Sequence, residues 1–271
     1  MRLHLSTPPR TRSLILLTLF LASCQATGID AHLFGSRAEV EGGYGIRQDA
    51  PPKLSTLADL GLENVGGEYG GRVDIPQARA HTTLTAISRE FAGTGTLTGD
   101  HTSIPTGSDV AAGFRFAQVD WQHTWNLLPS DNWYLGLGLG LGLIGTDMDI
   151  QDITPGGTGE SDDGYAIVPV PTLAGRLAYR RGALSVSASL KWLDFSLPLD
   201  AVGIGTVEGE VADADFQVSY TVWRKGGGGL GLHAGYRDYY GILDISENDE
   251  IGHTGIEYRA AYPYFGLSLF F

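Results

Sequence analysis

The sequence predicts an all-β fold: a closed antiparallel up-and-down transmembrane β-barrel of ten strands, with eight or twelve strands as the alternatives. Apolar residues recur at every second position in many segments, which is the period of a β-strand. Several segments exceed ten residues, whereas strands of soluble domains average about 5–6 and membrane-spanning strands need about 9–11. Short and long connections alternate between the segments, as in barrels that cross a bilayer.

Ten segments qualify as strands. In chain order they are 38–48, 69–76, 79–92, 110–125, 132–148, 164–181, 183–195, 209–224, 228–244 and 254–271. Short turns are expected at 75–79, 127–132, 180–183 and 224–229, and long loops at 49–68, 93–109, 149–163, 196–208 and 245–253. An even strand count places both ends of the barrel domain on the side of the short turns.

The stretch YLGLGLGLGLIG, residues 134–145, has the most regular alternation. Its leucines are separated by Gly136, Gly138, Gly140 and Gly142. Leucine on one face suits acyl chains, whereas glycine often marks the close approach of another group. Two outcomes are open. Long side chains such as Arg115, Arg176 or Arg237 fill the space over the glycines, or that space forms part of a pore.

Segment 110–125 does not keep a single alternation. Phe114 and Phe116 have even numbers, whereas Trp121 and Trp125 have odd ones. A β-bulge near Ala117 would bring the two halves into phase, and so would an error in the assumed strand.

The face opposite the apolar one carries both acids and bases. The interior candidates are Glu39, Glu41, Arg47, Arg72, Asp74, His81, Arg115, Asp120, Arg176, Lys191, Asp213, Asp215, His233 and Arg237, together with the four glycines. Buried charges are tolerated when they are paired. The main hypothesis is therefore a salt-bridge network that fills the barrel. A passage or binding site lined by the same residues, or a catalytic role, are the alternatives.

The first 23 residues form a secretory signal, with a basic start and an apolar run too short to span a bilayer. Its end, LASC, resembles the bacterial lipobox. The resemblance implies cleavage before Cys24, lipidation of that cysteine (palmitate among its acyl groups), and a linker over 24–37 before a barrel domain at 38–271. Gln25 after the cysteine favours sorting to the outer membrane. Loss of the three signal arginines takes the formal net charge from −13 to −16, which argues against nucleic-acid binding.

The chain ends in AYPYFGLSLFF, with apolar residues at alternate positions before the last residue. These are Phe265, Leu267, Leu269 and Phe271. The pattern resembles the C-terminal signal read by the barrel-assembly machinery. The mature chain resembles the small outer-membrane β-barrel proteins of Gram-negative bacteria, the OmpA/OmpW-like superfamily. This resemblance implies an outer-membrane location with the N-terminus on the periplasmic side.

Two of the expected external loops have distinctive compositions. Residues 147–163 and 244–250 are rich in carboxylates, which suit divalent cations, including those that bridge lipopolysaccharide phosphates. The alternative is a solvated anionic loop. Residues 51–65 place Leu54, Leu57, Ala58 and Leu62 at helical spacing. This spacing predicts a short amphipathic helix that caps the mouth, lies on the membrane, contacts a partner or packs on the rim.

These features favour an outer-membrane lipoprotein with a structural or envelope-interaction role, in contact with outer-membrane lipids and lipopolysaccharide. A narrow passive channel or small-ligand transporter is the alternative, and a hydrolase at the external rim, using His101 and His253 beside loop acids, is the third. No catalytic, metal or cofactor residue is assigned, and the sequence leaves the oligomeric state open.

Overall fold

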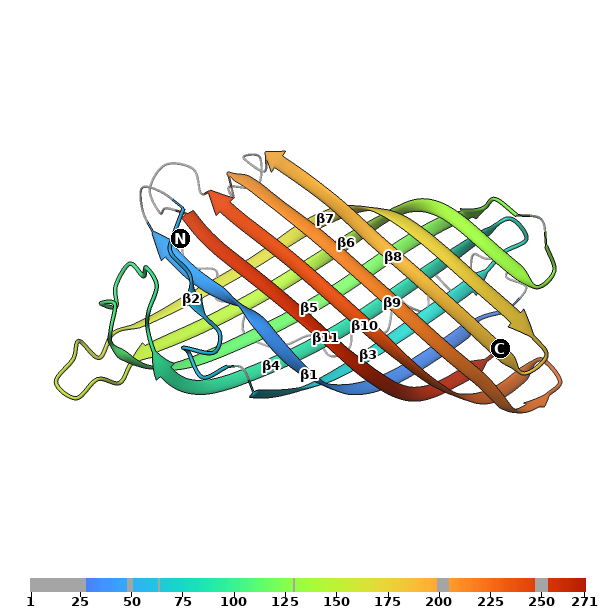
Figure 1. Cartoon of the computed structure of the whole chain (residues 1–271), viewed down its shortest axis with the longest axis horizontal. Helices are drawn as coiled ribbons and strands as arrows, with labels where there is room; N and C mark the ends of the chain where they lie inside the picture. Colours follow the sequence, from blue (N-terminus) through green and yellow to red (C-terminus); the bar gives the residue numbers. More distant parts are fainter. Residues whose placement is uncertain (1–27, 48–50, 63, 129, 199–204, 247–252) are drawn as a thin grey trace, which may run out of the picture.

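A computed structural model describes residues 28–47, 51–62, 64–128, 130–198, 205–246 and 253–271. The strands are β1 Asp30–Arg47, β2 Ser55–Thr56, β3 Asn64–Pro76, β4 Ala80–Thr96, β5 Asp109–Asn126, β6 Trp133–Asp152, β7 Ser161–Arg181, β8 Leu184–Pro198, β9 Thr206–Lys225, β10 Gly228–Ser246 and β11 His253–Phe270. Each of the long strands pairs with its chain neighbour, and β11 pairs with β1, so the antiparallel sheet closes into a ring (Figure 1).

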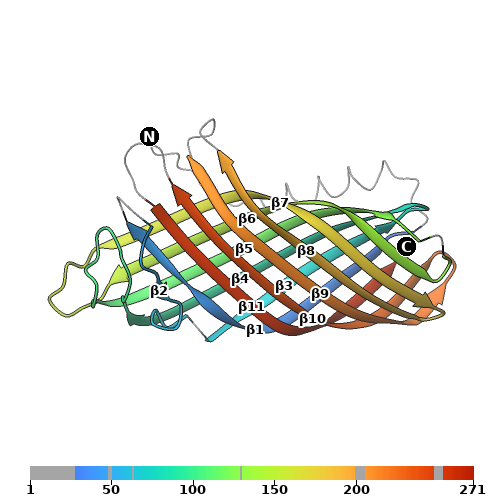
Figure 2. The same cartoon turned by 45° about the horizontal axis from the view of Figure 1, so that its top comes forward.

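The strands run obliquely to the long axis of the ring (Figures 1 and 2). The short turns between β3 and β4, β5 and β6, β7 and β8, and β9 and β10 share one end, on the right in Figure 1. We call it the short-turn end, and the opposite end the long-loop end. The C-terminus lies at the short-turn end, where Ile29 and Phe271 exchange backbone hydrogen bonds of 3.2 and 2.9 Å. Among the described residues, no helix has the length and hydropathy to cross a bilayer.

Between the short-turn end and the long-loop end, the inner and outer faces of the sheet exchange polarity. Strand β6 shows the position of this change. Over 135–143 the leucines of β6 point outward, with Leu137 58% and Leu143 48% exposed, whereas the residues between them face the interior. Over 144–152 the arrangement inverts, because Ile144 and Met148 are buried inside and Asp147 lies outside in contact with Arg115. We call these two parts of the ring the belt half and the loop half.

In the belt half, exposed leucines and aromatic residues continue around the outer surface. They include Trp121, Trp125, Trp133, Leu173, Leu190, Trp192, Phe216, Tyr220, Leu232, Tyr236, Phe265 and Leu267. An apolar surface of this extent is unusual in a soluble protein and marks a membrane or protein contact. In the loop half, apolar side chains fill the interior of the ring, and charged side chains such as Arg115 lie on its outer face.

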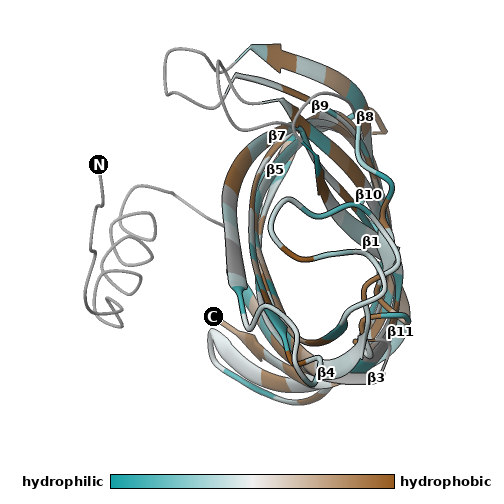
Figure 3. Ribbon diagram, turned by 90° about the vertical axis from the view of Figure 1, so that its left-hand side faces the viewer, coloured by the Kyte–Doolittle hydropathy of each residue, from teal (hydrophilic) through white to brown (hydrophobic). Residues whose placement is uncertain are grey.

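Residues of the first long loop close the long-loop end. Leu57, Leu60 and Leu62 are almost fully buried and join the apolar cluster inside the ring. The loop backbone packs directly on β4, since the amide of Thr96 donates to the carbonyl of Asp59 at 2.8 Å. A Cβ at Gly95 would overlap that carbonyl. Figure 3 looks into this end and shows loop segments crossing the mouth of the ring.

The helix predicted over 51–65 is wrong. Its place is taken by β2, which pairs with β1, and by a turn over 57–61. One helix-like bond is present, from the Leu60 amide to the Thr56 carbonyl at 3.2 Å. The leucine spacing reflects burial in the interior rather than a helix.

Three further expectations need correction. The described residues carry eleven strands rather than ten, β2 being the additional short one. β1 begins at Asp30 rather than at residue 38, so 30–37 belong to the sheet and not to a linker. β5 pairs with both neighbours in one unbroken register, so there is no bulge near Ala117, and Phe114 and Phe116 simply face inward.

The pairing between β7 and β8 is short, covering only residues 173–181 of β7. The Arg180 amide donates to the Asn132 carbonyl, beside β6, so even-numbered residues of β7 direct their N–H groups toward β6 and odd-numbered ones toward β8. Pro169 and Pro171 have odd numbers and no N–H group, and proline cannot donate to a β-ladder. The ladder therefore ends where these two donors are missing.

Candidate functional site: the charged interior and its pocket

The interior of the belt half contains a first group of paired charges, which we call the Asp74 cluster: Arg72, Asp74, Arg176 and Asp215. The Arg72 guanidinium bridges both acids, with Nε 2.8 Å from Asp74 Oδ2 and Nη1 2.8 Å from Asp215 Oδ2. The Asp74 carboxylate also accepts from Thr83 at 2.7 Å. These four residues come from β3, β7 and β9, so the cluster exists only when the ring is closed.

A second group, the Asp213 cluster, contains Asp120, Lys191, Asp213 and Arg237. Arg237 binds Asp213 through two hydrogen bonds of 2.8 and 2.6 Å, the geometry in which guanidinium–carboxylate pairs are strongest. Lys191 Nζ lies 2.5 Å from Asp120 and 2.6 Å from Asp213. Both clusters hold two cations and two anions, so the described belt interior carries balanced charge.

The space over the glycines of β6 is occupied. A Cβ at Gly136 would meet the Tyr134 ring at 2.5 Å, and one at Gly142 would meet the Asp120 carboxylate at 2.6 Å. A Cβ at Gly140 would meet the Thr172 hydroxyl at 2.4 Å, and one at Gly138 would overlap the His123 carbonyl of β5. The nearest occupants are therefore side chains and a backbone carbonyl of β5, β6 and β7, and not the arginines named as candidates.

The predicted interior residues lie as follows. Arg176, Lys191, Asp213, His233 and Arg237 are buried inside the ring, and the side chain of Asp215 is 15% exposed there. His233 Nδ1 lies 3.0 Å from the Ser268 hydroxyl, which also contacts His32.

The prediction for Arg115 is wrong. Its side chain lies on the outer face of the loop half, 66% exposed, and contacts Glu90 at 3.0 Å and Asp147 at 3.4 Å. Glu41 and Arg47 are exposed as well, whereas Val40 and Tyr44 are buried. The faces invert here because the interior of the loop half is an apolar cluster, in which an unpaired charged side chain would be costly. The side chain of Glu39 lies outside the described residues.

On the long-loop side of the two clusters, aromatic residues surround Arg89 inside the ring. Its guanidinium lies 4.6 Å from the centre of the Tyr262 ring, 5.5 Å from that of Tyr258 and 5.9 Å from that of Phe116. Aromatic faces attract cations, more strongly where water is excluded. Sequence reasoning missed this arrangement. The alternation along β4 and β5 could have indicated it, since Arg89 and Phe116 fall on the inner faces of these strands.

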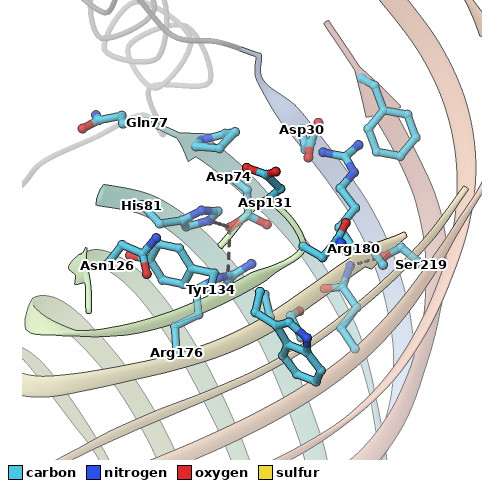
Figure 4. A pocket seen from close by; sticks show the side chains of 18 of the residues that line it. Asp30, Asp74, Gln77, His81, Asn126, Asp131, Tyr134, Arg176, Arg180 and Ser219 are labelled. Carbon is cyan, nitrogen blue, oxygen red and sulfur yellow. Dashed lines mark hydrogen bonds and ion pairs between the residues drawn. The ribbon is translucent and has the colours of Figure 1, made fainter. Parts of the chain in front are cut away.

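A pocket of about 280 Å³ opens into the belt interior near the short-turn end. It is lined by Asp74 and Arg176 of the Asp74 cluster, by His81 and Tyr134, and by hydroxyl and amide side chains of β8 and β9. In Figure 4 the side chains of Asp74, His81, Tyr134 and Arg176 gather on one side of the pocket, and Ser219 lies across from them. His81 Nε2 is 2.8 Å from Asp74. Beyond the pocket, the next cavity, beside the Asp213 cluster, measures only about 30 Å³, the share of a single water.

Among the described carboxylates of the long loops, Asp152 accepts hydrogen bonds from within its own loop. Asp152 accepts hydrogen bonds from the Thr154 amide at 2.9 Å and from the Thr158 amide and hydroxyl at 2.8 Å. These bonds, those of Thr154 first, hold the pKa of Asp152 well below its ordinary value. Hydrogen bonds from Thr56 and Thr98 lower the pKa of Asp59 in the same way. In the described part of the chain, no group of three or more His, Cys, Asp or Glu side chains is arranged to hold a metal ion.

Other predicted sites are only partly described. His253 Nδ1 lies 3.6 Å from Asp244 Oδ1, on the outer face of β10 and β11. Asp249 and Glu250 lie outside the described residues, as does Cys24.

Comparison with known structures shows the fold. The outer membrane protease OmpT from Escherichia coli aligns with a TM-score of 0.55 at 11% identity, over 91% of this chain and 98% of that one. Two other outer-membrane barrels superpose less well. They are the translocator domain of the autotransporter NalP from Neisseria meningitidis (TM-score 0.36, 11% identity, 94% and 93% coverage) and the toluene transporter TodX of Pseudomonas putida (0.35, 10%, 90% and 89%).

No protein-family model matches the sequence, and no curated protein does either. The structural similarity to OmpT shows that the fold is that of an outer-membrane β-barrel. The assignment to the OmpA/OmpW-like superfamily and the lipoprotein signal stay predictions.

Proposed function

We propose that this protein is an outer-membrane β-barrel lipoprotein with a closed interior and a non-catalytic, structural or envelope-interaction role. The observation that carries the proposal is the filling of the ring along its length. Two charge clusters occupy the belt half, and an apolar cluster capped by Leu57, Leu60 and Leu62 occupies the loop half.

The inversion of polarity supports a membrane position for the belt half. On β6, the segment from the first to the last outward-facing leucine, Leu135 to Leu143, is nine residues long, which agrees with the about 9–11 residues that a tilted strand needs to cross a bilayer. Arg115, Asp147 and Glu90 form ion pairs on the outer surface just beyond this belt. The loop half then extends into water on the external side, and the short turns face the periplasm.

A channel would require an open path through the interior. Cavities lined by described residues of the belt interior measure about 280 and 30 Å³. A further cavity at the start of the loop half, beside Ile144 and Tyr258, measures about 10 Å³. Below about 10–15 Å³, a cavity is too small for even one water. The dimensions of the described interior thus favour a closed barrel over a passive conduit.

Conductance in planar lipid bilayers tests the closed interior. The full-length protein is expected to give no stable single-channel steps at moderate voltage, whereas a porin reconstituted into the same bilayers gives steps and serves as the positive control. Stable steps from this protein would replace the closed-barrel proposal with the narrow channel.

The lipid anchor has a separate test. Cells that express the full chain are expected to incorporate radiolabelled palmitate into the protein, and the Cys24→Ala variant is expected to incorporate none. Because this is the only cysteine of the chain, label retained by the variant would rule out thioether lipidation at that position.

A further inference from the structure

The pocket at the short-turn end contains an unusual cation. The Arg176 side chain is only 7% exposed, and neither its Nε nor its Nη1 atom has a hydrogen-bond partner. The nearest acid atom is Asp74 Oδ1, 3.7 Å from Nη1. That carboxylate is already engaged by Arg72, His81 and Thr83. Arg176 therefore has charge balance but lacks acceptors for its Nε and Nη1 donors.

Buried donors without acceptors are costly, and more so when the group is charged. Arg176 lies opposite Gly136 in the β6–β7 ladder, and it lines the pocket of about 280 Å³. Arg176 is thus part of the wall of a space that can hold a ligand. A planar guanidinium presents paired donors that match the two oxygens of a carboxylate or phosphate.

The rest of the lining indicates a hydrophilic ligand. Ser185 and Ser187 of β8 and Ser219 and Thr221 of β9 supply hydroxyl groups on one wall, where Ser185 and Ser219 are direct cross-strand partners. The pocket volume corresponds to about nine water molecules at roughly 30 Å³ each, which sets the size of the ligand at a few carbon atoms with their oxygens.

We propose that this pocket is a binding site for a small hydrophilic oxyanion from the periplasmic side, whose carboxylate or phosphate group is bound by Arg176. The hydroxyl groups of β8 and β9 bind the remainder of the ligand. This site goes beyond the proposed structural role, and it does not depend on the closure of the loop half.

Isothermal titration of the full-length protein in detergent tests the site, with inorganic phosphate and acetate as the two probes at constant ionic strength. At least one probe is expected to bind the wild-type protein, and the stronger one identifies the phosphate or the carboxylate as the preferred group. The Arg176→Gln variant is expected to bind about 10- to 100-fold more weakly, since a hydrogen bond to a charged group contributes about 1.5–3 kcal/mol. Arg115→Gln, on the outer surface, is the matched control and should bind as the wild type does.

A second variant keeps the test valid if Arg176→Gln does not fold, as judged by loss of heat-modifiable migration on gels. Ser187→Leu fills the pocket from the opposite wall and leaves the Asp74 cluster intact, so it is expected to abolish binding in a folded barrel. Flat titrations of the wild type with both probes would overturn the proposal. Unchanged affinity in Arg176→Gln or in Ser187→Leu would overturn it as well. Conductance is not read in this experiment, so its result is independent of the closed-barrel proposal.

Discussion

An arginine in place of Leu139 is expected to destabilise the protein by about 2–4 kcal/mol, the cost of placing arginine at the midplane of a bilayer on the lipid face of a barrel. Leu139 is 52% exposed and lies at the centre of the outward-facing leucines of β6. The measurement is the free energy of unfolding in lipid vesicles, obtained from urea titrations.

Asp149→Arg is the matched control, because residue 149 faces outward on the same strand but in the loop half, where it is exposed. Surface substitutions in water usually change stability by less than about 0.5 kcal/mol. The difference between the two variants therefore measures the polarity of the surroundings at two heights of one strand. Equal effects of the two substitutions would contradict the assignment of the belt half to the membrane.

Most strands were predictable because their alternation of inward and outward side chains continues through both the belt half and the loop half. The leucine–glycine alternation of β6 and the alternation of serine with apolar residues in β8 leave no other regular structure that separates the two faces. What the sequence could not reveal was which face is interior. That assignment rested on the assumption of lipid outside, which holds for Leu137 but not for Arg115 or Glu41.

The first long loop shows a different limit of sequence reasoning. Its leucines are spaced as on a helix, and they are indeed buried, but their neighbours are Gly93 and Gly95 of β4, which let the loop backbone approach the strand. A spacing of three or four residues reports only that several side chains share a buried side. The contact that decides between helix and turn lies about thirty residues away in the chain.

The candidate site was predictable residue by residue but not as an arrangement. Arg176, Lys191, Asp213 and Arg237 were identifiable by alternation alone, since each falls on the polar face of its strand. Their division into two clusters depends on the stagger between neighbouring strands, which turn lengths determine only approximately. Tyr134 precedes the leucine–glycine alternation of β6, and its ring lies over Gly136.

The Asp213 cluster is the feature whose disruption is expected to have the largest effect. Asp213→Leu leaves Arg237 and Lys191 with Asp120 alone, at 3.8 and 2.5 Å. Removal of one partner from a buried ion pair costs about 3–5 kcal/mol, because the remaining charge is left uncompensated. The expected result is a loss of about that size in the free energy of unfolding, or failure of the barrel to assemble.

Two further variants separate charge balance from packing. The double variant Asp213→Asn with Arg237→Met removes one charge of each sign, so Lys191 and Asp120 remain paired and most of the stability is expected to return. The control, Asp238→Asn, breaks the exposed pair with Arg259, whose Nη2–Oδ2 distance is 3.5 Å, and exposed pairs contribute about 0–1 kcal/mol. If the double variant is no more stable than Asp213→Leu, charge balance is not what holds the interior, and close packing of these particular side chains takes its place as the explanation.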